Sequence, residues 1–471
     1  MIKTRFAPSP TGNIHIGNAR TALFSFLLAK KNDDSCFMLR IEDTDYERSE
    51  VQHIEHLMRD MRWLLMEWQE GPDVGGDYGP YWQSERNDIY TSYYQKLREL
   101  DLAYPCFCSE DHLAMVRKSQ KRRGESPRYP GTCRSLTESE IQSKLDQGIK
   151  PSLRFKIPKG ERIEFEDWVK GPQSFEADDI GDFIIQRSSG APSFMFCNAI
   201  DDALMKVTHV LRGEDHQTNT PRQLLILRAL GLPEPHYGHI ALILGLDGSP
   251  LSKRNGSKSM DQLHEEGYLP LALNNYLARL GHYYPHQNLL SLDQLAAEFK
   301  QESLAKSPAK FDEEQLYFWQ KQAVHQLDES QFWQWLEGIQ ERVPEVKRQL
   351  FYETVKPNVV LATDVEQWIA ICFELTKLTY SDKALATLRQ AGAAFFEEAL
   401  AYLDQAQEPT AEALLSQLKS NLGVSGKHLF LPVRVALTGL FKGPKLDPLF
   451  QLLGKQCVYQ RLQHVVQLIH E

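Results

Sequence analysis

Long apolar runs are absent from the sequence, in which no segment approaches the roughly 18 uncharged apolar residues that a membrane helix requires. Its 7 cysteines are an odd number at uneven spacing, so the sequence also lacks a disulfide framework. The N-terminal segment has neither the apolar core of a secretory signal nor the Arg-rich character of a transit peptide. These absences predict a protein of the reducing cytoplasm that has no membrane partner.

Basic residues are outnumbered, because 53 Lys and Arg face 63 Asp and Glu and the formal net charge is −10. This balance argues against indiscriminate binding of nucleic acid, but it allows a partner that is bound by local basic surfaces. The length of 471 residues predicts three or four domains. Repeats and low-complexity segments are missing, which excludes collagen-like and disordered classes.

Strand and helix signals alternate over residues 1–70. A strand over 2–7 precedes a Pro- and Gly-rich loop, and apolar residues at helical spacing predict a helix over 17–31. A second strand over 36–41 and a second helix over 50–65 follow. This alternation favours a parallel sheet with crossover helices.

The alternation is interrupted after residue 80 and resumes near residue 183, which predicts an insertion between two halves of one sheet. Within and after the insertion, we expect a helix over 88–100, strands over 152–157, 162–169, 183–186, 207–211 and 240–246, and a helix over 220–230. Helical patterns then predominate, at 263–280, 315–322, 329–340, 364–375, 383–403, 410–418 and 446–469.

Two segments could carry phosphate chemistry. Residues 11–18, Thr-Gly-Asn-Ile-His-Ile-Gly-Asn, lie where the first strand leads into the first helix, and there backbone N–H groups and the helix dipole favour a phosphate. The spacing matches neither the dinucleotide fingerprint nor the Walker loop, so a plain connector is an equal alternative. Later, Lys253 and Arg254 form a cation pair that suits a ligand whose negative charge grows during reaction.

Cys106, Cys108 and Cys133 raise the question of a metal. Two thiolates one residue apart and a third further along the chain could supply three of the four tetrahedral ligands of zinc. The alternative of three reduced structural thiols stays open.

Taken together, these motifs resemble those of the bacterial glutamyl-tRNA synthetases, a family of class I aminoacyl-tRNA synthetases. The resemblance covers essentially the whole chain in collinear order. It is carried by RFAPSPTGNIHIGNARTALF (5–24), LRIEDTD (39–45), GPDVGGDYGPYWQSER (71–86), VLRGEDHQTNTPRQ (210–223), PLSKRNG (250–256) and PVRVALTG (432–439).

The resemblance implies an α/β fold, with the Rossmann-like parallel sheet of class I synthetases, an inserted acceptor-binding domain and an all-α carboxy-terminal domain. The implied domains are the two halves of the catalytic domain (1–85 and 191–256), the inserted acceptor-end-binding domain (86–190), a helical connector (257–325) and an anticodon-binding domain (326–471).

The resemblance also implies a glutamate pocket, in which Arg5 and Arg212 hold the side-chain carboxylate and Glu42 meets the amine. Phe194 stands where relatives usually carry Tyr, and the lost hydrogen bond of about 0.5–1.5 kcal/mol predicts weaker glutamate affinity. The full implied glutamate-binding set is Arg5, Ser9, Glu42, Phe194, Asn198 and Arg212.

His15 and Lys253 are the implied catalytic residues, one in each of the two ATP signatures. Asn18 replaces the second His of the first signature, and Pro250 stands where many relatives have Lys. ATP is expected as a substrate together with Mg²⁺. The implied ATP-binding residues are Thr11, Gly12, His15, Gly17, Asn18, Glu214, His216, Ser252, Lys253 and Arg254.

In zinc-containing relatives the fourth ligand is often a Tyr four residues before the last Cys, so the implied zinc set is Cys106, Cys108, Tyr129 and Cys133. The tRNA acceptor end is expected against Arg117, Lys118 and Arg122. Asn358 aligns with a position where relatives that reject tRNA-Gln often carry Arg, and it is the expected contact with the anticodon end.

The predicted reaction is ATP-dependent ligation of L-glutamate to the 3′ end of tRNA-Glu through a glutamyl-adenylate, with release of AMP and pyrophosphate. A relaxed or tRNA-Gln-directed enzyme stays open as an alternative. A truncated paralogue that attaches glutamate to a queuosine base is less favoured, because it lacks the carboxy-terminal domain. A catalytically silent RNA-binding relative is disfavoured by the intact motifs. A monomer is expected.

Overall fold

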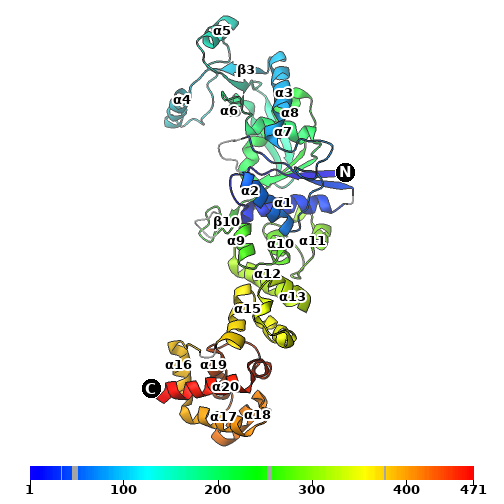
Figure 1. Cartoon of the computed structure of the whole chain (residues 1–471). Helices are drawn as coiled ribbons and strands as arrows, with labels where there is room; N and C mark the ends of the chain where they lie inside the picture. Colours follow the sequence, from blue (N-terminus) through cyan, green and yellow to red (C-terminus); the bar gives the residue numbers. More distant parts are fainter. Residues whose placement is uncertain (33, 45–50, 252–256, 376–377, 471) are drawn as a thin grey trace. The chain divides into compact units, whose positions relative to one another are not determined.

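The computed structural model describes residues 1–32, 34–44, 51–251, 257–375 and 378–470 (Figure 1). The predicted ATP-binding residues Ser252, Lys253 and Arg254 lie outside the described residues. The chain forms two compact units, which are treated separately below. The first comprises Met1–Leu263 with Leu273–Gln315, and the second comprises His264–Ala272 with Leu316–Glu471.

Parallel strands lie at the centre of the first unit. β1 (Ile2–Phe6) pairs in parallel with β2 (Ser35–Leu39), and β8 (His209–Gly213) pairs in parallel with β9 (His236–Ile240). The two pairs meet where the backbone N–H of Thr208 donates to the carbonyl of Lys3 at 2.9 Å. β1 and β8, which are far apart in the sequence, therefore lie side by side.

Helices cover these strands, and apolar burial explains where they form. α1 (Ile16–Lys30) is buried along most of its length, including every residue from Ala22 to Ala29. α8 (Thr220–Leu230) has a proline in its first turn and ends at Gly231, whose φ of 62° is a left-handed cap that glycine adopts without strain. The other helices of this region are α2 (Val51–Trp63) and α7 (Phe194–Leu204).

An insertion separates the two strand pairs in sequence. β3 (Ala103–Cys106), β4 (Ser152–Phe155) and β7 (Phe183–Gln186) form an antiparallel sheet, and β5 (Arg162–Asp167) with β6 (Gly171–Glu176) forms a hairpin. The backbone N–H of Trp168 donates to Tyr237 O at 2.7 Å, which ties the hairpin to β9. The helices here are α3 (Asn87–Glu99), α4 (Glu110–Arg122), α5 (Glu138–Asp146) and α6 (Ala177–Ile180).

Several sequence-based predictions of elements are wrong, and one of them is the continuous helix expected over 446–469, which is interrupted at Gly454, whose φ is 78°. The single helix expected over 263–280 is two helices, α9 (Met260–Glu265) and α10 (Pro270–Arg279), because Pro270 starts a helix and cannot continue one. The helix expected over 383–403 is likewise broken at Gly392, whose φ is 84°. The strand expected over 240–246 is wrong because β9 ends at Ile240 and a short β10 (Ile243–Leu244) pairs with β11 (Ala309–Lys310).

The described residues of the second unit form helices and no strands, around an apolar core that includes Phe351, Trp368 and Phe396. No helix in the described part of the chain has both the length and the hydropathy to cross a membrane. The remaining helices are α11 (Leu292–Glu298), α12 (Glu313–Gln326), α13 (Glu329–Trp335), α14 (Arg348–Val355), α15 (Ala362–Ile369), α16 (Asp382–Ala391), α17 (Ala393–Gln405), α18 (Ala411–Leu422), α19 (Lys427–Thr438) and α20 (Leu446–His470).

A buried arginine on α20 organises the helix ends of this unit. Arg461 is 1% exposed, and its guanidinium donates to the carbonyls of Leu437, Ile371 and Leu375. These carbonyls lie at or near the ends of other helices, where no intrahelical donor remains. One side chain therefore satisfies three acceptors from two separate segments, the end of α19 and the segment that follows α15.

Substituting Arg461→Met should lower the free energy of unfolding by about 2–4 kcal/mol, because buried carbonyls lose their donor. Urea unfolding followed by far-UV circular dichroism measures this change. Arg434→Met is the matched control, since half-buried Arg434 donates to the Pro444 carbonyl alone. Equal losses in the two variants would contradict the role assigned to Arg461.

Candidate active site at the carboxyl ends of β1 and β8

A cavity of about 690 Å³ opens where β1 and β8 end and α1 begins. This is the edge of a parallel sheet at which ligands of α/β proteins bind. The predicted site residues that line the cavity are Arg5, Ser9, Thr11, His15, Gly17, Asn18, Glu42, Phe194, Asn198, Arg212 and His216.

Two predicted ATP-binding residues in the described part of the chain, Gly12 and Glu214, do not line this cavity. Glu214 has protein partners instead. Its carboxylate accepts from the backbone N–H of Leu242 at 3.0 Å and from Lys170 Nζ at 2.6 Å. Because Leu242 lines the cavity, Glu214 supports the wall of the site from behind.

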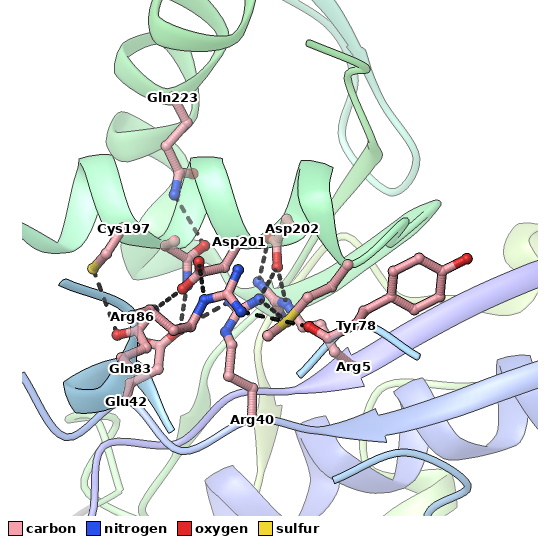
Figure 2. A network of polar contacts seen from close by, with 12 residues as sticks. Arg5, Arg40, Glu42, Tyr78, Gln83, Arg86, Cys197, Asp201, Asp202 and Gln223 are labelled. Carbon is pink, nitrogen blue, oxygen red and sulfur yellow. Dashed lines mark hydrogen bonds and ion pairs between the residues drawn. The ribbon is translucent and has the colours of Figure 1, made fainter. Parts of the chain in front are cut away.

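A buried ionic network, drawn in Figure 2, includes the cavity-lining residues Arg5 and Glu42. Asp202 on α7 accepts from Arg40 Nη1 at 2.7 Å and from Arg5 Nε at 3.3 Å, and its second oxygen lies 3.4 Å from Arg5 Nη2. Arg40 also donates to Glu42 at 3.1 Å. Burial favours a raised pKa at Asp202, but the two guanidinium groups outweigh it and lower that pKa.

A chain of amides connects Glu42 to Arg212. Asn198 Nδ2 donates to Glu42 Oε1, and Gln223 Nε2 donates to Asn198 Oδ1 at 3.0 Å. Gln223 Oε1 then accepts from Arg212 Nη2 at 2.7 Å. Burial raises the pKa of Glu42, against the opposing influence of Arg40 and Arg5. The acidic and basic groups at this end of the cavity are therefore positioned by shared neutral partners.

The other end of the cavity is formed by the start of α1. His15 is the N-cap residue of this helix, and Gly17 and Asn18 belong to its first turn. Backbone N–H groups at a helix start have no intrahelical acceptor, and the helix dipole there favours an anion. Nearby, the ring centroids of His216 and Phe194 lie 5.3 Å apart. Burial, followed by the charge of Arg212, lowers the pKa of His216.

Several residues that build the site were missed by the sequence patterns. Arg20 lines the cavity and donates to the carbonyls of Ala241 at 2.6 Å and Leu280 at 3.1 Å. Burial lowers the pKa of Arg20 to about 10. Arg40 and Asp202 form the ionic network, and the adjacent acids Asp201 and Asp202 in the largely apolar α7 were a usable signal of buried cationic partners.

Asp201, next to Asp202, anchors α7 to a different segment. Its carboxylate accepts from Arg86 Nε at 2.7 Å, from Tyr90 Oη at 2.7 Å and from Gln83 Nε2 at 2.8 Å. Arg86 and Asp201 are both buried, so this pair is hardly screened by solvent. The two neighbouring acids thus bind α7 to two sets of donors, as Figure 2 shows.

The thiols of Cys106, Cys108 and Cys133 come together in the insertion, with all three sulfur atoms within 4.8 Å of one another. The sulfur atoms of Cys108 and Cys133 are 3.7 Å apart. The hydroxyl of Tyr129 lies 3.4 Å from Cys106 Sγ and 3.6 Å from Cys108 Sγ. The four predicted metal ligands therefore form one compact cluster.

The predicted tRNA-contacting residues lie at the surface. Arg117, Lys118 and Arg122 are exposed on α4 in the first unit. Asn358 is exposed in the second unit, in a short 3₁₀ turn after α14, and its amide donates to Thr354 O at 3.4 Å.

Comparison with models of protein families identifies the family of the chain. Residues 1–318 match the catalytic domain of the class I tRNA synthetases (E and Q), and residues 296–466 match an anticodon binding domain. The chain therefore belongs to the class I tRNA synthetases of the glutamate and glutamine group.

Within this group the similarity is to glutamate–tRNA ligases. The chain is 53% identical to glutamate–tRNA ligase 2 of Coxiella burnetii, over 99% of this chain and 100% of the relative. For glutamate–tRNA ligase 2 of Nitrosococcus oceani, identity is 53% and coverage 99% and 98%. The crystal structure of a glutamate tRNA ligase from Elizabethkingia meningosepticum in complex with its amino acid is 28% identical, covers 99% of both chains and has a TM-score of 0.87. The family, enzyme class and fold class predicted from the sequence are confirmed.

Replacing Asp202 by Asn should lower the free energy of unfolding by about 3–5 kcal/mol, because two buried guanidinium groups lose their shared counter-charge. Chemical denaturation of the variant and the unmodified chain tests this. Asp179→Asn serves as the control, since exposed Asp179 lies 3.5 Å from exposed Arg128 and such pairs contribute under about 1 kcal/mol. A change of less than about 1 kcal/mol at Asp202 would contradict the importance of the network.

Proposed function

We propose that this protein activates L-glutamate with ATP and transfers it to the 3′ end of tRNA-Glu, as a glutamate–tRNA ligase. One observation carries the proposal: the same cavity is lined by two buried arginines, Arg5 and Arg212, and by the N-terminal start of α1 at His15. A small dianionic amino acid and a nucleotide phosphate thus each have a complementary region in one cavity.

At the amino-acid end, Arg5 and Arg212 bind the side-chain carboxylate, and Glu42 receives the ammonium group. The burial of all three residues supports these roles, because charge–charge interactions strengthen when water is excluded. Ser9 and Asn198 complete the pocket. Phe194 presents a ring without a hydroxyl, so glutamate loses one hydrogen bond relative to relatives that carry Tyr.

ATP binds with its phosphates toward the start of α1, where Thr11, His15, Gly17 and Asn18 meet them, while Gly12 shapes the loop. The base and ribose lie toward His216 and the segment after Glu214. Mg²⁺ accompanies ATP and neutralises part of the phosphate charge. Ser252, Lys253 and Arg254, which lie outside the described residues, are assigned to the leaving pyrophosphate on their sequence motif alone.

The reaction needs no protein nucleophile. The α-carboxylate of glutamate attacks the α-phosphorus of ATP, the bond to the β-phosphate oxygen breaks, and pyrophosphate leaves. A terminal ribose hydroxyl of tRNA then attacks the carbonyl of the adenylate and releases AMP. Positioning of the reactants, and donors from His15 and the helix start toward the developing charge, account for the acceleration.

The tRNA is held at two places. Arg117, Lys118 and Arg122 on α4 contact acceptor-end phosphates, which position the RNA without reading its sequence. Asn358 belongs to the anticodon-reading unit, where the absence of Arg is the sole basis for a relaxed or tRNA-Gln-directed alternative. The anticodon binding domain at 296–466 argues against the truncated queuosine-modifying paralogue. The monomeric state and the cytoplasmic location stay predictions.

Charging assays with purified tRNA-Glu and tRNA-Gln should give glutamyl-tRNA-Glu, with much slower formation of glutamyl-tRNA-Gln. Glutamine and aspartate in place of glutamate are the substrate controls. Comparable charging of both tRNAs would establish the relaxed alternative. If neither tRNA were charged with Mg²⁺ and zinc supplied, the proposed function would be wrong.

We also propose that zinc is the ligand of the thiol cluster. Two thiolates bound to one tetrahedral zinc at about 2.3 Å lie about 3.8 Å apart, and the 3.7 Å between Cys108 and Cys133 fits this separation. The hydroxyl of Tyr129 completes four donors of suitable type. Bound zinc would supply structural cross-linking here, because Cys106 ends β3 while Cys133 belongs to a distant loop.

The purified protein should contain one zinc ion per chain by elemental analysis. Cys133→Ser should lower the zinc content and the thermal stability of the inserted domain, because three donors hold the ion less tightly than four. Cys457→Ser is the control, since Cys457 lies on α20 in the second unit. Zinc content that is unaffected by Cys133→Ser would refute the proposed site.

A further inference from the structure

Arg212 is held by neutral partners. Its Nη2 donates to Thr220 Oγ1 at 2.8 Å and to Gln223 Oε1 at 2.7 Å, and its Nε donates to His239 Nε2 at 3.1 Å. Arg212 is 4% exposed, and in the described part of the chain it forms no ion pair. Its Nη1 is buried without a hydrogen-bond partner, and the residue lines the cavity.

The protonation of His239 follows from its neighbours. An arginine Nε–H can only donate, so His239 Nε2 must accept, and the ring proton must sit on Nδ1. There it meets the carboxylate of Asp167, which accepts it through Oδ2. An imidazole that accepts through Nε2 is neutral. Burial, aided by the charge of Arg212, also lowers the pKa of His239 against the opposing bond to Asp167. Hydrogen bonds therefore run in one direction, from Arg212 through His239 to Asp167.

Asp167 and His239 lie behind the cavity wall. They are 1% and 0% exposed, and neither lines the cavity. Asp167 ends β5 of the hairpin, where its Oδ1 accepts from the backbone N–H groups of Val169 at 2.9 Å and Lys170 at 2.8 Å. The carboxylate is thus fixed by the hairpin turn before it meets the imidazole.

Arg5 differs from Arg212 in its charge balance. Its guanidinium is already paired with Asp202, the carboxylate that Arg40 shares. Arg212 is linked to carboxylates only through neutral side chains, to Asp167 through His239 and to Glu42 through Gln223 and Asn198. A buried cation without a direct counter-ion gains most when an anionic ligand arrives, and gains least from a neutral amide of the same shape.

We propose that Asp167 and His239 are positioning residues for Arg212. By fixing the Nδ1-protonated tautomer, Asp167 keeps His239 Nε2 an acceptor, which aims Arg212 Nη1 at the side-chain carboxylate of glutamate. Arg212, rather than Arg5, then supplies the discrimination between glutamate and glutamine. This inference rests on the proposed function, because it assigns a substrate carboxylate to Arg212.

The decisive variant is Asp167→Asn. The amide oxygen can keep the bonds to the hairpin turn, while the new NH₂ group faces His239 Nδ1 and can only donate to it. The ring proton then moves to Nε2, where it opposes the N–H of Arg212. We expect the KM for glutamate to rise about tenfold or more with kcat changed less than about threefold, the pattern of lost substrate binding.

Two readouts and a control variant separate this role from a purely structural one. The KM for ATP should change less than about twofold, because Arg212 is assigned to the amino acid. The ratio of kcat/KM for glutamate over glutamine should fall. Asp182→Asn is the matched control, since buried Asp182 accepts from Arg134 at 2.6 Å and from the backbone of Ile157 at 2.9 Å in the insertion and should leave the glutamate KM unchanged.

A double-mutant cycle tests the tautomer itself. In His239→Gln the amide oxygen can accept from Arg212 whatever Asp167 does, so this variant should retain a lower glutamate KM than His239→Phe. Adding Asp167→Asn to His239→Gln should then have little further effect. If the two changes multiplied instead, Asp167 would act through the hairpin turn alone and the proposal would be wrong.

An unchanged glutamate KM in Asp167→Asn, or equal increases in the KM for glutamate and for ATP, would overturn the inference. If Asp167→Asn did not fold, equal glutamate KM values in His239→Gln and His239→Phe would overturn it, and a lower value in His239→Gln would support it. Absence of charging by the unmodified chain would refute the proposed function, whereas normal charging with unaffected variants would refute only this inference.

Discussion

The shared carboxylate of Asp202 is the interaction on which the end of the cavity near Arg5 and Glu42 depends. Arg5 from β1 and Arg40 from the end of β2 both pair with it, so one side chain of α7 joins two adjacent parallel strands. Burying two guanidinium groups is costly without a counter-charge, and removing the counter-charge costs more than the pair itself contributes. The network therefore fixes one arrangement of strand ends and helix.

Two arginines of the same cavity are stabilised in different ways. Arg5 has a direct ion pair, whereas Arg212 has a hydroxyl, an amide and an imidazole around it. Burial lowers the pKa of Arg212 to about 10, which still leaves it charged near neutral pH. A buried guanidinium group without a direct ion pair favours the binding of an anion, because the anion supplies the counter-charge that the group lacks after folding has excluded water. The inserted hairpin and the catalytic sheet cooperate here, since Asp167 belongs to one and Arg212 to the other.

The sequence predicted those helices and strands whose apolar spacing agrees with the burial of their side chains in the fold. The strand over 183–186 and the helix over 220–230 coincide with β7 and α8. α5 gave no usable apolar pattern because it buries no side chain and begins with a capping box of Thr137 and Glu140. The helix expected over 383–403 was broken at Gly392, where the chain needs a positive φ that periodicity does not reveal. Apolar spacing thus predicts which face of a helix is buried, but it does not predict where a helix is interrupted.

By itself the sequence determined the family and predicted Arg5 and Arg212 as pocket residues, because the residue types of its motifs and their collinear order match one family. Only the tertiary structure decided which partner each charge has. Asp202, Asp167 and His239 belong to none of the sequence motifs, and Arg40 belongs to one without a predicted role. Their importance comes from burial, where a charge or a ring proton must find a partner across long stretches of chain. Distant residues become chemically coupled only when folding removes the water between them.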